Sequence, residues 1–154
     1  MPDLPDLRDP AIPATVVMAA LGLQPHPEGG HYREVWNPAD ADGGRGVVSS
    51  ILFLLAAGER SHWHRVDATE IWFWQGGAPL LLGIAGPVAG RRTIRLGPDL
   101  RSGEAPQGLV PSGAWQEARS LGAWTLASCV VAPAFRFAGF ELAPSGWEPP
   151  PGPA

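Results

Sequence analysis

Residues 58–77 read GERSHWHRVDATEIWFWQGG, and this stretch decides both the fold and the candidate site of the 154-residue chain. Its two histidines stand one residue apart in a run that is typical of a half-buried β-strand. Because residues two apart on a strand point to the same face, we expect His62 and His64 to project together and Trp63 to face the other way. After a short turn, we expect Glu70 to begin an antiparallel neighbouring strand and to point to the same face.

A metal site is the first interpretation of this pattern. Two imidazoles and a carboxylate that converge inside a barrel suit Zn, Fe(II), Mn or Ni. Downstream, Pro111 and Gly113 form a turn that is able to bring a second strand back over the site, and this strand carries Gln116. An amide oxygen is able to coordinate a cation, although it is a poorer ligand than imidazole. The predicted metal ligands are therefore His62, His64, Glu70 and Gln116.

General acid–base chemistry is the second interpretation. The two interpretations exclude each other for any one histidine, because a nitrogen that binds a metal has no free lone pair for proton abstraction. Without a metal, His62 or His64 is a candidate general base near neutral pH, with Glu70 or Asp67 fixing its tautomer. The third interpretation is structural, with both histidines as hydrogen-bonded core residues. Glu70 argues against it, because a buried carboxylate is costly unless it is paired or coordinated.

The composition favours a single all-β domain. The length allows one core, and 20 glycines with 18 prolines suit short strands joined by tight turns. Apolar residues at helical spacing between Pro10 and Gly22 predict one helix. Strands are predicted at His31–Trp36, Val47–Leu55, His62–Val66, Glu70–Trp74, Pro79–Ala85, Arg92–Leu96, Trp115–Arg119, Ala123–Val131 and Phe135–Leu142.

Strands at this spacing, with no helices between them, indicate an antiparallel jelly-roll barrel. We place the domain at residues 10–144, after an N-terminal extension at 1–9. A Pro-rich tail follows at 145–154, and because proline cannot join a central strand, we expect the tail to lie on the surface or to be mobile.

The charge pattern and the cysteine content narrow the class of protein. The net charge of −4 comes from interspersed charges without a Lys/Arg cluster, so we expect no nucleic-acid partner and no membrane partner. Cys129 is the only cysteine, which fits a reducing compartment, and its apolar neighbours favour a packing role. The N-terminus has no basic or apolar signal region, and no apolar run approaches the length of a spanning helix. We therefore predict a cytoplasmic protein.

The two stretches around the histidines and Gln116 resemble the motifs of the cupin superfamily. Its first motif runs from a glycine through a His-x-His pair to a glutamate and a glycine, and its second has Pro-x-Gly followed by a histidine. The first is matched, with shorter spacing before the histidines, by Gly58, His62, His64, Glu70 and Gly76. The second is matched by Pro111 and Gly113, with Gln116 where the histidine is expected.

A finer resemblance is to a small cupin subfamily whose members are similar in fold to the dTDP-4-dehydrorhamnose epimerases. It covers the chain from the helix to about Leu142. The motifs that carry it stand here as His26-Pro27-Glu28-Gly29-Gly30, His64-Arg65, Glu70-Ile71-Trp72 and Pro111-Ser112-Gly113-Ala114-Trp115-Gln116. The resemblance implies a cupin jelly-roll (double-stranded β-helix) barrel with a small-molecule cavity. It also implies a homodimer, which exposed strand edges make physically reasonable.

The function that this resemblance implies is an isomerase, which epimerises a carbohydrate, a nucleotide sugar or a similar hydroxy-carbonyl compound by proton abstraction. The expected catalytic residues are His64, Glu70 and Tyr32, with Tyr32 as the acid on the opposite face. The expected substrate-binding residues are Glu28, Arg33, Glu34, Trp72 and Trp74, the indoles because they stack well on sugars. The alternatives stay open: an edge tyrosine with a hydrated hydroxyl for Tyr32, plain packing for the tryptophans, and a surface ion pair for Arg33. The alternative functions are a metal-dependent oxygenase or lyase and a non-catalytic small-molecule binder.

Overall fold

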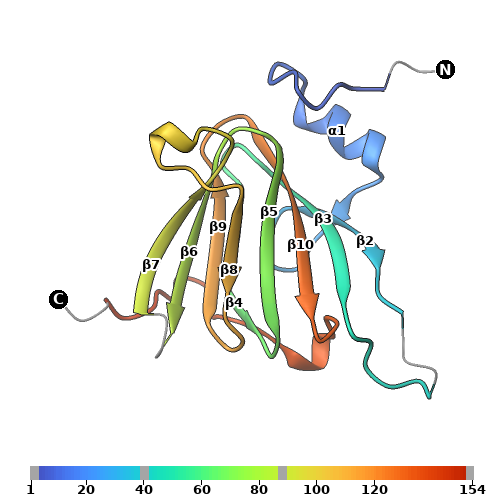
Figure 1. Ribbon diagram of the computed structural model, residues 1–154, viewed down its shortest axis with the longest axis vertical. Coiled ribbons are helices and arrows are strands. Elements are labelled where there is room, and N and C mark those ends of the chain that lie inside the picture. The colour runs from blue at the N-terminus through green and yellow to red at the C-terminus, as the bar shows by residue number, and fades with distance from the viewer. Residues whose placement is uncertain (1–3, 39–41, 87–89, 152–154) are drawn as a thin grey trace.

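The computed structural model describes residues 4–38, 42–86 and 90–151. Its strands form two antiparallel sheets that face each other, which is the predicted all-β jelly roll (Figure 1). One sheet has the strand order β1 (Gln24–Pro25), β2 (His31–Trp36), β3 (Ser49–Ala56), β10 (Trp124–Ala132), β5 (Thr69–Gly77) and β8 (Gln107–Val110). The other has the order β11 (Phe140–Leu142), β4 (Arg60–Val66), β9 (Trp115–Ser120), β6 (Leu80–Gly86) and β7 (Gly90–Leu96).

The α-helix α1 (Ala14–Leu21) lies on the outer face of the six-stranded sheet (Figure 1). It begins later than predicted because Pro13 is extended and acts as its N-cap. It ends at Gly22, whose φ of 64° is left-handed and therefore suits glycine. Val17 of this helix is fully buried and packs against Leu54 and Trp124 of the sheet. Within the described ranges, no helix is long and apolar enough to cross a membrane.

The alternation of side chains along β3 divides them between two cores. Phe53 and Leu55 point between the sheets, where they pack with Trp72 and Ile84. Leu54 points outward and packs beneath α1. The interior core packs directly against the candidate site, because Tyr32, Ile51 and Cys129 belong to both.

The tail is held against the outer face of the five-stranded sheet by contacts that extend to Pro149. The Trp147 ring meets Trp63 edge-on, with centroids 6.3 Å apart, and lies 4.6 Å from Trp115. Glu148 accepts a hydrogen bond from the Trp63 indole at 3.0 Å and pairs with Arg60 at 2.9 Å. The described part of the tail is therefore a surface segment, which the apolar contacts of Trp147 and the ion pair of Glu148 hold in place.

Several further elements differ from the sequence prediction. The short strands β1 and β8 were not predicted, because each is too short to show a period of its own and is extended mainly by pairing with β2 or β5. The predicted strand Phe135–Leu142 is interrupted by a 3-10 turn, η2 (Phe137–Gly139), so only β11 remains as strand. A second 3-10 turn, η1 (Leu100–Ser102), lies between β7 and β8.

Candidate functional site

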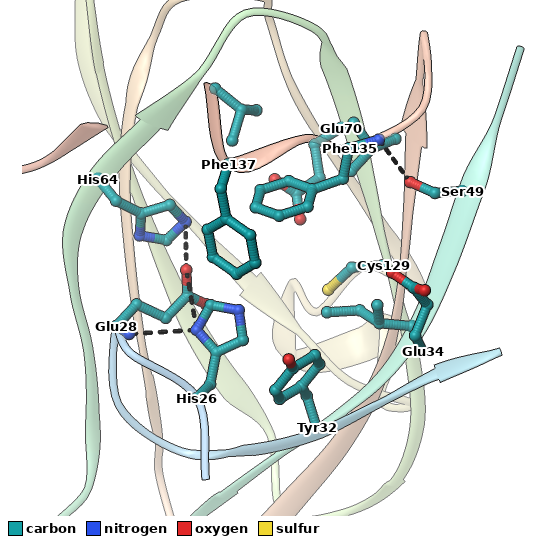
Figure 2. Close-up of a pocket in the computed structure, with 13 residues that line it drawn as sticks. His26, Glu28, Tyr32, Glu34, Ser49, His64, Glu70, Cys129, Phe135 and Phe137 are labelled. Carbon is teal, nitrogen blue, oxygen red and sulfur yellow. Dashed lines mark hydrogen bonds and ion pairs between the residues drawn. The ribbon is translucent and has the colours of Figure 1, made fainter. Parts of the chain in front are cut away.

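A cavity of about 50 Å³ lies between the two sheets (Figure 2). That volume is room for roughly four water molecules. Apolar walls come from Ile51, Val66 and Val131 on three strands, and from Phe135 and Phe137 after β10. The groups that carry chemistry in the lining are His26, Glu28, Tyr32, Glu34, His64 and Glu70.

A β-bulge in β4 separates the two histidines of the His-x-His pair. Ser61 pairs with Ala118 and His64 pairs with Gln116, so two residues of β4 stand opposite one residue of β9. His64 therefore points into the cavity, while His62 lies outside the lining and donates from Nε2 to the Pro144 carbonyl at 3.0 Å. The expectation that the two histidines share a face is wrong, because strict alternation holds only in a strand without a bulge.

His26 and Glu28 reach the cavity from one tight turn before β2. The His26 N–H bonds to the Gly30 carbonyl at 2.9 Å, and Gly29 and Gly30 have φ values of 107° and 75°. These left-handed values favour glycine. The turn is fastened to β4 because the His62 N–H donates to the Glu28 carbonyl at 2.8 Å. The His-Pro-Glu-Gly-Gly motif therefore forms the turn that places the side chains of His26 and Glu28 in the site.

His64 and Glu28 form a buried ion pair. His64 Nε2 lies 3.0 Å from Glu28 Oε2, and His64 Nδ1 donates to the His62 carbonyl at 2.8 Å. Burial by itself lowers the pKa of His64, but the charge and hydrogen bond of Glu28 outweigh it and raise the pKa to about 9. Burial raises the pKa of Glu28, yet the attraction of His64 leaves it below its usual value. Both groups are charged near neutral pH, and both nitrogens of His64 are occupied.

Glu70 faces the cavity from the six-stranded sheet. It was expected on an antiparallel neighbour of β4, but β4 and β5 lie in different sheets, so it reaches the site from the opposite wall. Its Oε2 accepts a hydrogen bond from Gln116 Nε2 at 2.6 Å, and Gln116 Oε1 accepts one from the Trp72 indole at 2.8 Å. Burial raises the pKa of Glu70 to about 7, because it outweighs the attraction of His64.

His26 was not predicted as a site residue, although it belongs to the motif from which Glu28 was chosen. Its Nδ1 accepts a hydrogen bond from the Glu28 backbone N–H at 3.1 Å. Burial lowers the pKa of His26, so the ring is neutral and its proton is on Nε2. Figure 2 shows the ring in the cavity beside Tyr32, with the two centroids 4.5 Å apart.

Among the remaining predicted site residues, those of β2 divide according to strand alternation. Tyr32 and Glu34 line the cavity, whereas Arg33 between them is exposed and lies outside the lining. Trp72 is buried in the interior core and Trp74 donates its indole N–H to the Ala78 carbonyl at 3.1 Å, so the structure brings neither indole to the cavity.

The predicted metal ligands do not come together as a donor set. His62 is outside the cavity, both nitrogens of His64 are occupied, and the Gln116 oxygen is bound by Trp72. In the part of the chain that the structure describes, there is no group of three or more His, Cys, Asp or Glu side chains that is arranged to hold a metal ion. The residues of this site therefore do not fit a resident metal.

Cys129 also lines the cavity, next to Glu70. Burial and the nearby charges of Glu70 and Glu28 raise the pKa of its thiol well above the usual range. The thiol is therefore neutral. This agrees with the packing role that its apolar neighbours predict.

Comparisons with known proteins agree with this architecture. A family model described as Cupin superfamily (DUF985) matches residues 15–143. A protein from Shewanella oneidensis of known structure is 38% identical, with a TM-score of 0.79 over 86% of this chain and 85% of that one. A hypothetical protein from Leishmania major is 30% identical, with a TM-score of 0.75 over 84% and 86% of the two chains.

Oxalate decarboxylase from Bacillus subtilis has a TM-score of 0.60 over 77% of this chain and 29% of that one. Its identity of 16% is too low to indicate more than a shared fold. No curated protein matches the sequence.

Proposed function

This chain belongs to the cupin superfamily, and from that premise we propose that it is an isomerase that removes and returns a proton next to a carbonyl group. One observation carries the proposal. Glu70, which is only 6% exposed, and Tyr32 both line a small cavity from one sheet, with β3 and β10 between their strands, and Figure 2 shows them at opposite ends of that cavity. A base and an acid on opposite faces are what inversion at a carbon centre requires.

Glu70 is the general base. Its hydrogen-bond partner Gln116 is a neutral amide, which fixes the carboxylate without cancelling its charge. A pKa of about 7 matches a base that works near neutral pH, because proton transfer is most effective when the catalytic pKa lies close to the working pH. His64 was the alternative base, but neither of its nitrogens has a free lone pair.

His26 stabilises the negative charge that develops on the substrate oxygen. The Nε2–H of His26 is the donor for that oxygen, because its Nδ1 is fixed by the Glu28 backbone. His64 lies in the same wall, and its charge is paired with Glu28. Donors and charges that are already in place before the reaction stabilise an enolate more effectively than water does. Tyr32 then supplies the proton on the face opposite Glu70.

The size of the cavity restricts the substrate. About 50 Å³ accommodates roughly four or five non-hydrogen atoms, on the basis of about one atom for each water position. We therefore propose a small hydroxy-carbonyl compound. A carbohydrate or nucleotide sugar places only its reacting end inside, with the remainder outside past Glu34.

Deuterium exchange tests this function. The protein is incubated in deuterated buffer with hydroxyacetone, dihydroxyacetone and glyceraldehyde, and proton NMR follows the loss of signal at the carbon next to the carbonyl. We expect catalysed exchange with at least one compound, slower by at least about 100-fold in Glu70→Gln. Glu141→Gln is the matched control, since Glu141 pairs with Arg65 on the surface away from the cavity. Binding without exchange for the whole panel would favour a non-catalytic binder.

A further inference from the structure

The charges that face the cavity do not cancel. His64 and Glu28 neutralise each other as an ion pair. Glu70 and Glu34 add two carboxylates, and the hydrogen-bond partners of these two are the neutral amides of Gln116 and Asn37, at 2.6 and 3.0 Å. Among the described lining residues there is no Arg or Lys. Glu70 is more than nine-tenths buried and points into the cavity without a cation in contact.

Two arginines that lie beside the cavity residue Phe135 are bound elsewhere. Arg45 and Arg136 flank Phe135, but both pair with Asp67, at 2.7 and 3.4 Å. Arg45 also donates to the Ala134 carbonyl at 2.7 Å. The anionic part of a ligand inside the cavity therefore has no free cation to meet in the described lining.

The walls of the same cavity are aromatic. Tyr32 forms one side, and Phe135 and Phe137 form another, with their rings edge-on and their centroids 5.0 Å apart. Phe137 is 57% exposed and so stands where the cavity meets solvent. Aromatic faces attract cations, and this attraction grows when the site excludes water. Carboxylates and aromatic faces together are the complement of an ammonium group.

We infer that the cavity selects small carbonyl compounds that carry a primary ammonium group beside the carbonyl, in preference to neutral or anionic compounds of the same size. The carbonyl half of this inference rests on the proposed function. The preference for positive charge does not, because it follows from the carboxylates and aromatic rings alone. Glu70 and Glu34 receive the ammonium group, and Tyr32, Phe135 and Phe137 surround it.

A series of three nearly isosteric probes tests the preference. Aminoacetone, hydroxyacetone and pyruvate share the acetyl group and differ in charge from positive through neutral to negative. Dissociation constants are measured by NMR titration near neutral pH. We expect aminoacetone to bind about tenfold more tightly than hydroxyacetone, as a desolvated cation beside aromatic rings and a carboxylate requires. Pyruvate is expected to bind more weakly than either.

Variants locate the origin of the preference. Glu70→Gln keeps the shape and the Gln116 contact, and we expect it to remove most of the advantage of aminoacetone. Glu34→Gln is expected to remove a smaller part, and Glu141→Gln none. Equal affinities for the three probes, tightest binding of pyruvate, or an advantage that survives both cavity variants would each overturn the inference.

The outcomes separate this inference from the proposed function. Tight binding of aminoacetone without deuterium exchange supports the charge preference and removes the isomerase. Deuterium exchange on hydroxyacetone without any preference for aminoacetone supports the isomerase and removes the charge preference.

Discussion

Gln116 donates to Glu70 from the facing sheet, with 2.6 Å between the amide nitrogen and the carboxylate oxygen. The same side chain accepts the Trp72 indole N–H, so a chain of two hydrogen bonds crosses the interior of the barrel. The residue that stands where the cupin motif has a histidine therefore acts here by positioning a carboxylate.

Replacing Gln116 by Leu should destabilise the protein by about 2–4 kcal/mol, because it leaves the Trp72 donor and the Glu70 acceptor without partners in a buried place. Urea unfolding near neutral pH measures the loss. Trp72→Phe removes only the far end of the chain of hydrogen bonds, and its effect on the position of Glu70 should be smaller. A Gln116→Leu protein as stable as the wild type would show that these two hydrogen bonds contribute nothing to stability.

Glu70 should make stability depend on pH. Its folded pKa of about 7 is raised above the unfolded value of 4.5, so its contribution is complete below about pH 4.5 and is lost as the pH rises through about 7. The loss should be on the order of 3 kcal/mol. Glu70→Gln has no such loss and should become more stable relative to the wild type between about pH 5 and pH 8. Parallel stability curves for the two proteins would contradict this.

Glu28→Gln should remove the counter-ion of His64. A buried ion pair that loses one partner costs on the order of 3 kcal/mol, although deprotonation of the imidazole limits the cost. The pKa of His64 should fall from about 9, which NMR titration of the ring measures directly. Because that pKa is raised above the usual 6.5, wild-type stability from this pair is lost as the pH rises through about 9, and the variant should not show that loss.

The exposed end of β2 should form the homodimer that the cupin resemblance implies. Only His31 and Tyr32 of this strand pair with β1, and Val35 and Trp36 beyond them are 53% and 59% exposed. Light scattering should give a dimeric mass at micromolar concentration, and Trp36→Glu should shift it to a monomer. Leu142→Glu changes an exposed apolar residue on another strand and is the control. A monomeric wild-type protein would exclude the dimer.

The fold was predictable because it follows from patterns that depend on neighbours in sequence. The boundaries of β2 and the end of α1 at Gly22 match the prediction, since alternation and a glycine cap are local signals. His62 was misplaced because a bulge depends on how β4 pairs with β9, which the strand itself does not reveal. The role of Gln116 depends on two side chains from the facing sheet, and a sequence pattern indicates which residues are polar but not which of their atoms are already bonded.

The bulge in β4 also bears on how chemistry changes during evolution. Between Ser61 and His64, β4 has one residue more than the paired segment of β9. This bulge is enough to turn one imidazole of the pair out of the barrel, although the His-x-His motif is unchanged in the sequence. The register in which β4 pairs with β9 thus decides whether both imidazoles or only one of them faces the cavity. Homologues with the same His-x-His spelling should therefore be sorted by the register of this strand before a cofactor is assigned to them.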